Sequence, residues 1–532
     1  MEVLSNSSSP EAHQSILNSI SSSSSIEALS RITWQHVATA VVVYYASLVF
    51  YRLYLHPLAK FPGPKLAAIS RWYEAYYDLI LDGQYTFKIE EMHKQYGPII
   101  RISPFELHVS DPAYFEKLFR QDGRWDKYAW SYDAFGAPLS AVSCSPHDLH
   151  RRRRAPLNNF FSKSNVASKQ QIIKELVDKL CQRIDAVSGT DKTINLGIAV
   201  SAFTRDASTN FIIGKSYNNL EREDFNQAMT KTIVGLGMMW RVTKHIRWVA
   251  PLLLSLPTSV AKAIGDEGNK AFFVFLENSR NDTKKIMEAS MSENPDPTMP
   301  HTLVHDIMKS KLPDAEKRLD RVYEEVTSVT GAGYESTASV LRQIIYYVFK
   351  DPVMLARLRA EIAAARQETG TADLSVAALE QLPYLTAVIM EGLRLSPSVA
   401  SRLARVAPDR DLYYEKWCIP KGTPVGMTTL LMHRDENLYP QASLFNPERW
   451  MDLELRKKSD KTFVPFSRGT RNCLGMHLAW AELYLVTSAL VMRFDFKFDG
   501  AGPKDVDIVS DQFIVGVADP SGIKAWVTRY GV

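Results

Sequence analysis

The sequence predicts a mainly helical protein with a small β region, preceded by one membrane-spanning helix. Helical patterns fill most of the 532 residues, and proline ends several of them, as at Pro352 and Pro397. Only short strand-like segments are found, near residues 99–103, 107–109, 417–419 and 513–517. A third observation is an uncharged apolar run near the N-terminus, which has the composition of a membrane helix.

The N-terminal region begins with a polar tail and continues into this apolar run. Residues 1–30 are rich in serine and are expected to form a disordered tail. Residues 37–51 carry no charge. With Trp34 and a snorkelling Arg52 they extend to a predicted anchor over 34–55, which has the roughly 20 residues needed to span a bilayer. A helix buried in the core is the alternative interpretation.

The flanks of the run predict its orientation. Lys60, Lys65 and Arg71 follow it, whereas the leading tail contains acids such as Glu2 and Glu11. Positive flanks stay on the cytosolic side, so we expect a lumenal tail and a cytosolic catalytic domain at the endoplasmic reticulum membrane. No small-residue cleavage site follows the run, which favours an uncleaved anchor.

Residues 56–66 form a predicted hinge between the anchor and one large domain over 67–532. Pro62 and Pro64 flank a glycine in this hinge and prevent a helix from continuing through it. Within the domain, the apolar stretch 235–256 is interpreted either as core or as a segment that dips into the membrane interface.

The composition fits one large catalytic domain and excludes several other classes. The chain is 45% hydrophobic and 23% charged, which allows a large buried core. Its net charge of +4 is mild for this length and does not suggest a nucleic-acid partner. The four cysteines are far apart and lack metal-site spacing, which predicts a reducing compartment without a disulfide scaffold.

The residues around Cys473 form the most specific pattern in the chain. Residues 466–475 read FSRGTRNCLG and lead into an apolar helical stretch. A thiolate persists at neutral pH only where its pKa is lowered, and the following helix can place its N-terminus beside the sulfur. Gly469 and Gly475 can provide positive φ or close approach, so that amide groups point at the sulfur. Phe466 would exclude water, and Arg471 could bind a haem propionate.

This run resembles the haem-binding signature of the cytochrome P450 family, Phe-x-x-Gly-x-Arg-x-Cys-x-Gly, at every specified position. The resemblance covers about residue 61 to the C-terminus. It implies an α-rich triangular prism with a small β region, and haem b with Cys473 as the axial ligand of the iron. A buried cysteine in an ordinary turn is the alternative.

Two further segments match the family in the expected order. Glu391 and Arg394 lie at i and i+3 on one helix, and Arg449 follows in the segment FNPERW. The resemblance implies that these three residues form a buried ion network that fixes the loop below the haem. For an isolated Glu-x-x-Arg pattern, an exposed helix pair worth a few tenths of a kcal/mol would be the simpler interpretation.

The third match lies in one long helical pattern over 314–350. Mid-helix glycine normally lowers stability, so Gly331 and Gly333 indicate close packing or a local opening. The resemblance places this opening above the distal haem face, where an acid and an alcohol deliver protons. Those positions hold Glu335 and Ser336, with Thr337 as a second hydroxyl. Serine replaces the usual threonine here, and it could instead bond to the carbonyl one turn earlier.

Three more residues are implied as propionate ligands. His150 and Arg154 stand where many members of the family have Trp-x-x-x-Arg, within a run of four arginines that could also face the redox partner. Arg405 is the third candidate, and Arg402 competes with it for that role.

The family positions of the substrate pocket are all apolar, which predicts a small lipophilic substrate. They are Phe135, Ala332, Val399, Ala400, Phe513 and Ile514. The hinge and the arginine-rich segment resemble filamentous-fungal members, including the trichodiene oxygenase group. A secondary metabolite is therefore expected, a terpenoid before a polyketide.

The resemblance implies a haem-thiolate monooxygenase. The chain lacks a complete dinucleotide fingerprint, so electrons are expected from a separate NADPH-cytochrome P450 reductase. Two alternatives are a haem-thiolate isomerase or dehydratase that needs no reductase, and a haem-binding sensor without turnover. The presence of Glu335 and Ser336 argues against the isomerase, and a membrane anchor argues against the sensor.

Overall fold

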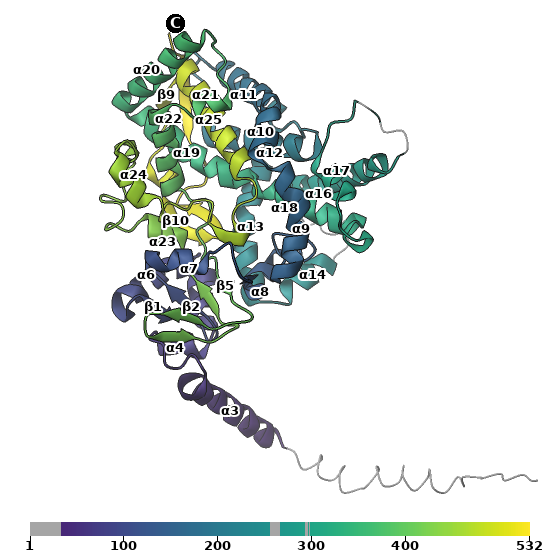
Figure 1. The fold of residues 1–532 in the computed structure, drawn as a ribbon, viewed down its shortest axis with the longest axis vertical. Coiled ribbons are helices and arrows are strands. Elements are labelled where there is room, and N and C mark those ends of the chain that lie inside the picture. The colour runs from purple at the N-terminus through teal and green to yellow at the C-terminus, as the bar shows by residue number, and fades with distance from the viewer. Residues whose placement is uncertain (1–32, 256–265, 293–295, 297, 532) are drawn as a thin grey trace, which may run out of the picture. The chain divides into compact units, whose positions relative to one another are not determined.

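The computed structural model describes residues 33–255, 266–292, 296 and 298–531 (Figure 1). The chain forms two units, one that ends at Lys60 and one over Phe61–Val532. The tail predicted over residues 1–30 lies outside the described residues.

The first unit contains one long apolar helix. It consists of α3 (Trp34–Phe50), followed by one π-helical turn, η1 (Tyr51–Leu55). Together they form a helix over Trp34–Leu55 of 22 residues, with a mean hydropathy of 1.4 and no buried residue in its most apolar window. Its bounds agree with the predicted anchor, and it is long and apolar enough to cross a bilayer.

The predicted hinge is shorter than expected. Pro64 is the N-cap of α4 (Lys65–Ile69), so residues 65 and 66 are helical and the extended linker ends at Pro64. A proline in this place is compatible with a helix start, because the amide hydrogen that it lacks has no partner there.

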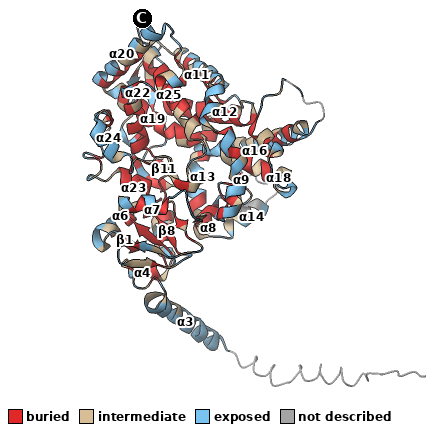
Figure 2. Ribbon diagram, in the orientation of Figure 1, coloured by how far each residue is buried: buried red, intermediate tan, exposed pale blue. Residues whose placement is uncertain are grey.

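The core of the second unit is built around α12 (Leu196–Ile213), which is buried on nearly all sides (Figure 2). A helix that is apolar all round must lie inside other helices. Its neighbours α11 (Gln170–Asp185), α18 (Leu319–Ala332) and α19 (Tyr334–Lys350) pack on it, and α25 (Met476–Arg493) packs on α11 and α19.

The β region is small, and its largest sheet lies at the opposite end of this unit from α11 and α20 (Pro352–Thr369) (Figure 1). The largest sheet has five strands in the order β1 (Ile99–Arg101), β2 (Leu107–Val109), β8 (Pro424–Gly426), β5 (Arg405–Val406) and β3 (Asp126–Lys127). The other sheets are β4 (Ile194–Asn195), β12 (Lys524–Arg529) and β9 (Phe494–Phe498); β6 (Leu412–Tyr414) and β7 (Trp417–Ile419); and β10 (Ile508–Gln512) and β11 (Ile514–Val517).

The remaining helices surround this core. They are α5 (Trp72–Ala75), η2 (Tyr76–Ile80), α6 (Tyr85–Tyr96), α7 (Phe115–Leu118), α8 (Ala129–Tyr132), η4 (Asp133–Phe135), α9 (His147–Phe160), α10 (Lys163–Ser168), α13 (Gln227–His245), α14 (Val249–Ser255), α16 (Glu267–Ser290), α17 (Leu303–Lys309), α21 (Val376–Leu379), α22 (Pro383–Leu395), α23 (Thr429–His433), η7 (Pro447–Trp450), α24 (Leu453–Ser459) and η8 (Gly469–Arg471).

The helix predicted over 314–350 is not continuous. A 3-10 turn over Asp314–Glu316 precedes α18, and Gly333 separates α18 from α19. At Gly333 an added Cβ would lie 2.0 Å from Ser208 Oγ on α12, whereas at Gly331 it would meet no atom within 4 Å. Gly333 therefore allows close packing at the break, and Gly331 faces open space.

Candidate active site

The Cys473 loop lies between the short helix η8 and the start of α25 at Met476. The Cys473 amide donates to the Phe466 carbonyl at 2.9 Å, which closes the loop. Burial raises the pKa of the Cys473 thiol, while a hydrogen bond from the Gly475 amide and the charge of Arg154 oppose this rise. Cys473 nevertheless has exposed surface. Protein thus surrounds the thiol without covering it, as expected for a ligand that faces a bound group.

The two glycines of this loop differ. Gly469 has φ +77°, and an added Cβ would lie 2.5 Å from the Arg120 carbonyl oxygen. The Thr470 amide donates to the same oxygen at 3.2 Å. Gly475 has φ −86°, and an added Cβ would meet no atom within 4 Å. The prediction of positive φ or close approach therefore holds at Gly469 and is wrong for Gly475, whose amide still reaches the sulfur.

Five basic side chains gather near this loop, and we call them the cationic cluster. They are Lys127, His150, Arg154, Arg405 and Arg471. Among the residues that the structure describes, none of the five forms an ion pair with a carboxylate. Arg471 donates to the carbonyls of Cys144 (2.7 Å) and Ser145 (2.6 Å), and Arg154 donates to the backbone and side-chain oxygens of Asn472 (2.7 and 3.0 Å).

Burial acts on every member of the cationic cluster. It lowers the pKa of Arg405, and it lowers that of Arg471 to about 10 with help from Arg405. Burial, together with Arg471 and Lys127, lowers the pKa of His150 to about 2, so the imidazole is neutral. Desolvation is the first cause of every shift, and neighbouring positive groups add to it at His150, Arg471 and Lys127.

The sharpest crowding is between two neighbouring strands. Lys127 of β3 lies directly opposite Arg405 of β5, and both side chains are buried. Like charges opposite each other in an antiparallel pair are destabilising. The Lys127 ammonium donates to the Val142 carbonyl at 2.6 Å, and burial lowers its pKa far below the usual value. Sequence reasoning missed Lys127, although its place between aromatic residues in WDKYAW is unusual for a lysine.

The cationic cluster fits the two propionates of a haem. An anionic group with two carboxylates would neutralise the like charges and accept from the donors of Arg405, His150 and Lys127. Arg154 and Arg471 belong to the cluster and also touch or form the Cys473 loop, so the cluster and the thiol are parts of one site. The residues present therefore fit haem, with Cys473 at the iron.

Arg402 does not belong to this cluster. Its guanidinium is paired with Glu106 at 2.7 Å and Glu74 at 2.9 Å, all buried. These carboxylates already satisfy it, which leaves Arg405 as the candidate for a propionate.

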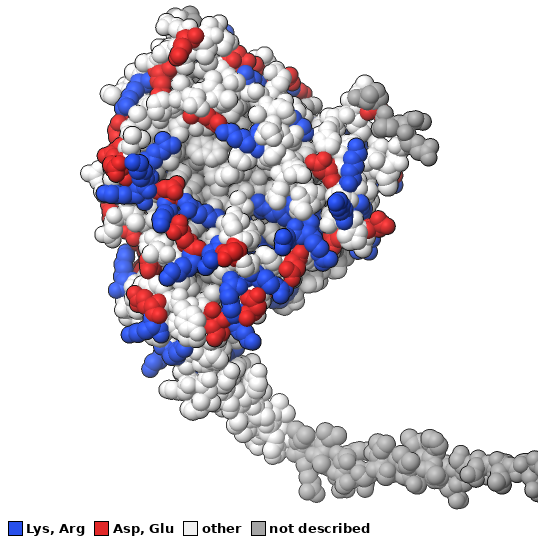
Figure 3. Space-filling view, in the orientation of Figure 1, with Lys and Arg blue, Asp and Glu red and all other residues white. Residues whose placement is uncertain are grey.

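The four consecutive arginines of α9 have different surroundings. Arg153 is buried and paired with Glu316 at 2.7 Å. Arg154 reaches the Cys473 loop. Arg151 and Arg152 are exposed, and Figure 3 shows Lys and Arg side chains gathered over α9. Only these last two are placed to meet a partner protein.

The three residues expected in an ion network are paired. Glu391 binds Arg394 at 2.7 Å and Arg449 at 3.0 Å, and it also accepts from the Trp450 indole at 2.9 Å. Arg394 donates further to the carbonyls of His433 and Ala442. Glu391 and Arg394 are fully buried, so each needs the other.

Glu335, Ser336 and Thr337 lie in the first turn of α19, which we call the distal helix. Their side chains do not form one chain of hydrogen bonds. Glu335 is paired with Arg342 at 2.6 Å. Ser336 Oγ donates to the Ala332 carbonyl at 2.7 Å, which is the local alternative considered from the sequence. Thr337 hydrogen-bonds to Glu482 on α25, whose pKa burial raises to about 8. Glu482 is thus a buried neutral acid that the sequence did not reveal.

Five of the six predicted pocket residues come together from three segments. Phe513 contacts Phe135 (ring centroids 4.6 Å apart) and Trp240 (5.2 Å). Val399 bridges to Ile514, and the Ala400 amide donates to the Phe513 carbonyl at 3.0 Å. In addition, Ala332 is exposed at the end of α18.

The apolar stretch over 235–256 contains both buried and exposed apolar side chains. Trp240 is buried and donates to the Ser131 carbonyl at 3.0 Å, so it belongs to the pocket wall. Leu236, Met238, Trp248 and Leu252 are exposed. Trp240 therefore belongs to the core, and contact of the exposed side chains with the membrane interface stays a prediction.

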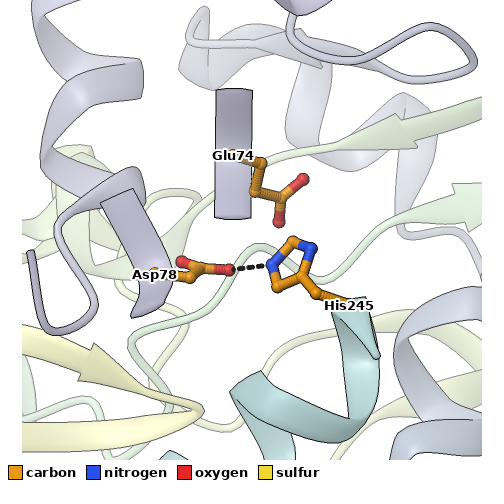
Figure 4. A group of neighbouring side chains, drawn as sticks. All are labelled: Glu74, Asp78 and His245. Carbon is orange, nitrogen blue, oxygen red and sulfur yellow. Dashed lines mark hydrogen bonds and ion pairs between the residues drawn. The ribbon is translucent and has the colours of Figure 1, made fainter. Parts of the chain in front are cut away.

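A second polar group lies between the N-terminal helices and α13. Glu74, Asp78 and His245 point toward one another, with ligand atoms close enough for a metal ion (Figure 4). However, the Lys244 ammonium binds Glu74 at 2.9 Å and Asp78 at 2.6 Å. Burial opposes ionisation of Asp78, but Lys244 and His245 outweigh it and lower its pKa. A lysine therefore supplies the positive charge, and the group is an ion network.

Comparison with known proteins shows the family of the chain. The family model described as Cytochrome P450 matches residues 73–520. The chain is 38% identical over 488 residues to Cytochrome P450 monooxygenase MO6277 of Ascocoryne sarcoides, which covers 89% of this chain and 94% of that protein. It is 36% identical to Tryptophan 6-hydroxylase fscE of Fusarium equiseti (91% and 94% covered), and 33% identical to Cytochrome P450 monooxygenase TRI4 of Fusarium sporotrichioides (92% and 94% covered).

Proposed function

The chain belongs to the cytochrome P450 family, and from this premise we propose that it inserts one oxygen atom from O2 into a lipophilic secondary metabolite. It is a monooxygenase, and its family implies haem. The observation that carries the proposal is the exposed but surrounded thiol of Cys473 beside a buried cationic cluster that forms no ion pair with a carboxylate among the described residues.

The residues of the site have distinct roles in this proposal. Haem would supply the iron chemistry that activates oxygen, and Cys473 would hold the iron through its thiolate. The Gly475 amide and Arg154 stabilise negative charge on the sulfur. Arg405, Arg471, His150 and Lys127 hold the propionates and thereby orient the ring.

Proton delivery is assigned to the turn after Gly333. Ser336 Oγ donates to the Ala332 carbonyl, and a rotation of the side chain would release it to donate toward the distal face. Glu335 is the acid of this turn, and its Oε1 has no hydrogen-bond partner among the described residues. Thr337 hydrogen-bonds to Glu482 and therefore fixes the turn against α25.

Electrons are proposed to come from an NADPH-cytochrome P450 reductase in the endoplasmic reticulum membrane. The exposed Arg151 and Arg152 of α9 are suited to an acidic docking surface, next to the arginine that touches the Cys473 loop. The apolar helix over Trp34–Leu55 is the proposed single-pass anchor, with the domain over 67–532 in the cytosol.

The substrate is proposed to be a terpenoid, with a polyketide next. The apolar pocket residues and the likeness to TRI4 support a terpenoid skeleton. A second candidate is an indole, because relatives include tryptophan 6-hydroxylases and because Phe135, Trp240 and Phe513 can contact a flat ring.

The deciding experiment is the carbon-monoxide difference spectrum of the reduced protein, with NADPH consumption in the presence of reductase. We expect the red-shifted thiolate band, and Cys473→Ala should lose both the band and turnover. Cys144→Ala is the control that should keep them, because Cys144 meets Arg471 of the loop through its backbone carbonyl, which alanine retains. Turnover without reductase would favour an isomerase, and a band without any turnover would favour a sensor.

A further inference from the structure

Ser398 has a backbone conformation that serine rarely adopts. It follows α22 by three residues, after Pro397, and its φ is +64°. A non-glycine residue in this region costs roughly 1 kcal/mol or more, and such strain is concentrated at functional positions. Hydrogen bonds hold it there, since the Val515 amide donates to the Ser398 carbonyl at 3.0 Å.

The strained backbone directs the Ser398 hydroxyl at the distal helix. Ser398 Oγ donates to the carbonyl oxygen of Ser336 at 2.8 Å. The same oxygen accepts from Ser339 Oγ at 3.0 Å, and Ser396 Oγ in turn donates to Ser339 Oγ at 3.2 Å. Two serines of one segment therefore act on a single carbonyl, one directly and one through Ser339.

This carbonyl belongs to the turn that carries the candidate proton donors. A hydroxyl that donates to a helical carbonyl competes with the backbone ladder and bends the helix. Here the turn begins directly after the break at Gly333. Two hydroxyls therefore fix the position of the turn. Ser398 Oγ donates to the Ser336 carbonyl, and Ser336 Oγ donates to the Ala332 carbonyl.

The segment that carries Ser398 is itself fixed from the other side. Val399 bridges to Ile514, and the Ala400 amide donates to the carbonyl of Phe513, which also has a positive φ of +67°. The backbone around Ser398 is therefore fixed by the β10–β11 hairpin. The Ser398 hydroxyl connects this fixed segment to α19.

We propose that Ser398 is a positioning residue, which holds the Ser336 turn in the geometry needed for proton delivery. The inference rests on the proposed monooxygenase function. It assigns Ser398 no contact with substrate or haem, because its hydroxyl acts through the Ser336 carbonyl.

The test uses the full-length holoenzyme in detergent. Ser398→Gly keeps the positive φ and removes the hydroxyl, whereas Ser398→Asn also accepts this φ and restores an N–H donor. Hydrogen exchange of peptides over residues 331–341 should become about two- to tenfold faster in Ser398→Gly, as expected for one lost hydrogen bond. With reductase, the share of NADPH electrons that appears as hydrogen peroxide should rise by a similar factor. Ser398→Asn should reverse both changes in part.

A matched control and a second variant complete the test. Glu415→Gly also places glycine at a positive φ, +46°, in the exposed turn between β6 and β7, and it should leave both readouts unchanged. Ser396→Ala removes only the indirect donor and should give smaller changes of the same sign, even if Ser398→Gly fails to fold. Unchanged exchange and peroxide yield in the serine variants, with the carbon-monoxide band intact, would overturn the inference alone. Absence of that band from the unaltered protein would overturn the proposed function.

Discussion

Two groups of buried charges in this molecule are built in opposite ways. Around Glu391 every guanidinium faces a carboxylate, so the chain itself completes the network. In the cationic cluster, Lys127 and Arg405 lie opposite each other, and no acid among the described residues pairs with them. A buried charge without a partner is strongly unfavourable. The first group therefore stabilises the fold, and the second is the one that we propose haem propionates complete.

The largest expected effect is on the complete network. Glu391→Gln leaves Arg394 buried without its partner, which should lower the free energy of unfolding by about 3–5 kcal/mol. Urea unfolding of the detergent-solubilised protein measures this. Arg357→Met, which breaks the exposed pair with Glu448, is the control and should change stability by less than about 1 kcal/mol. Equal losses in both variants would contradict the role assigned to burial.

The second prediction compares haem retention and stability after loss of an arginine from the cationic cluster and after loss of an arginine from a complete ion network. Arg405→Met removes one charge from the cationic cluster, so haem should transfer to apomyoglobin roughly tenfold faster or more, as for a lost charge-assisted hydrogen bond. The fold should keep its stability, because a repulsive neighbour of Lys127 is removed. Arg402→Met, only three residues away, should lower stability and leave haem transfer unchanged, because it takes the guanidinium from Glu106 and leaves Glu74 with Lys244 alone. Equal rates of haem transfer and equal stabilities of the two variants would contradict the distinction between the cationic cluster and the complete ion networks.

Glu482 has the opposite charge type to the cationic cluster: it is a buried acid that pairs with no cation among the described residues. Its pKa in the folded protein is raised to about 8, above its ordinary value of 4.5. As the pH rises above the ordinary value, the unfolded chain releases this proton while the folded chain retains it, so stability falls with rising pH. Glu482→Gln should remove this slope, with a relative gain of at most about 2 kcal/mol between about pH 5.5 and pH 7. Unfolding curves at both pH values measure it, and parallel slopes would exclude a neutral Glu482.

The smallest effect concerns arginines that remain in water. Arg151→Glu together with Arg152→Glu should slow reduction by the reductase severalfold at low salt, with convergence to the wild-type rate at high salt. Stopped-flow reduction at two ionic strengths measures this. Haem content and stability should not change, since neither side chain is buried. A loss of haem would instead place these residues in the cationic cluster.

Much of the architecture could be predicted because it is encoded locally. The run around Cys473 and the segments at Glu391 and Arg449 are short patterns, and the family, the helical fold class and the enzyme class that they implied are confirmed. The apolar helix over Trp34–Leu55 also follows from composition. The roles of individual site residues stay predictions.

The features that were missed depend on tertiary contacts. Lys127 becomes important only because β3 pairs with β5 and brings it opposite Arg405. Likewise Glu482 is a neutral acid only because α25 is buried against α19. The break at Gly333 depends on Ser208 of α12, which no periodicity within the distal helix could indicate. Such positions are determined by partners more than a hundred residues away.

The contacts of the Cys473 loop also determine when it can form during synthesis. Gly469 and Thr470 are held by the carbonyl of Arg120, and Arg471 by those of Cys144 and Ser145. These partners leave the ribosome more than three hundred residues before the loop does. Neither half can build the iron-binding pocket alone, so the nascent chain cannot capture its cofactor until translation is nearly finished.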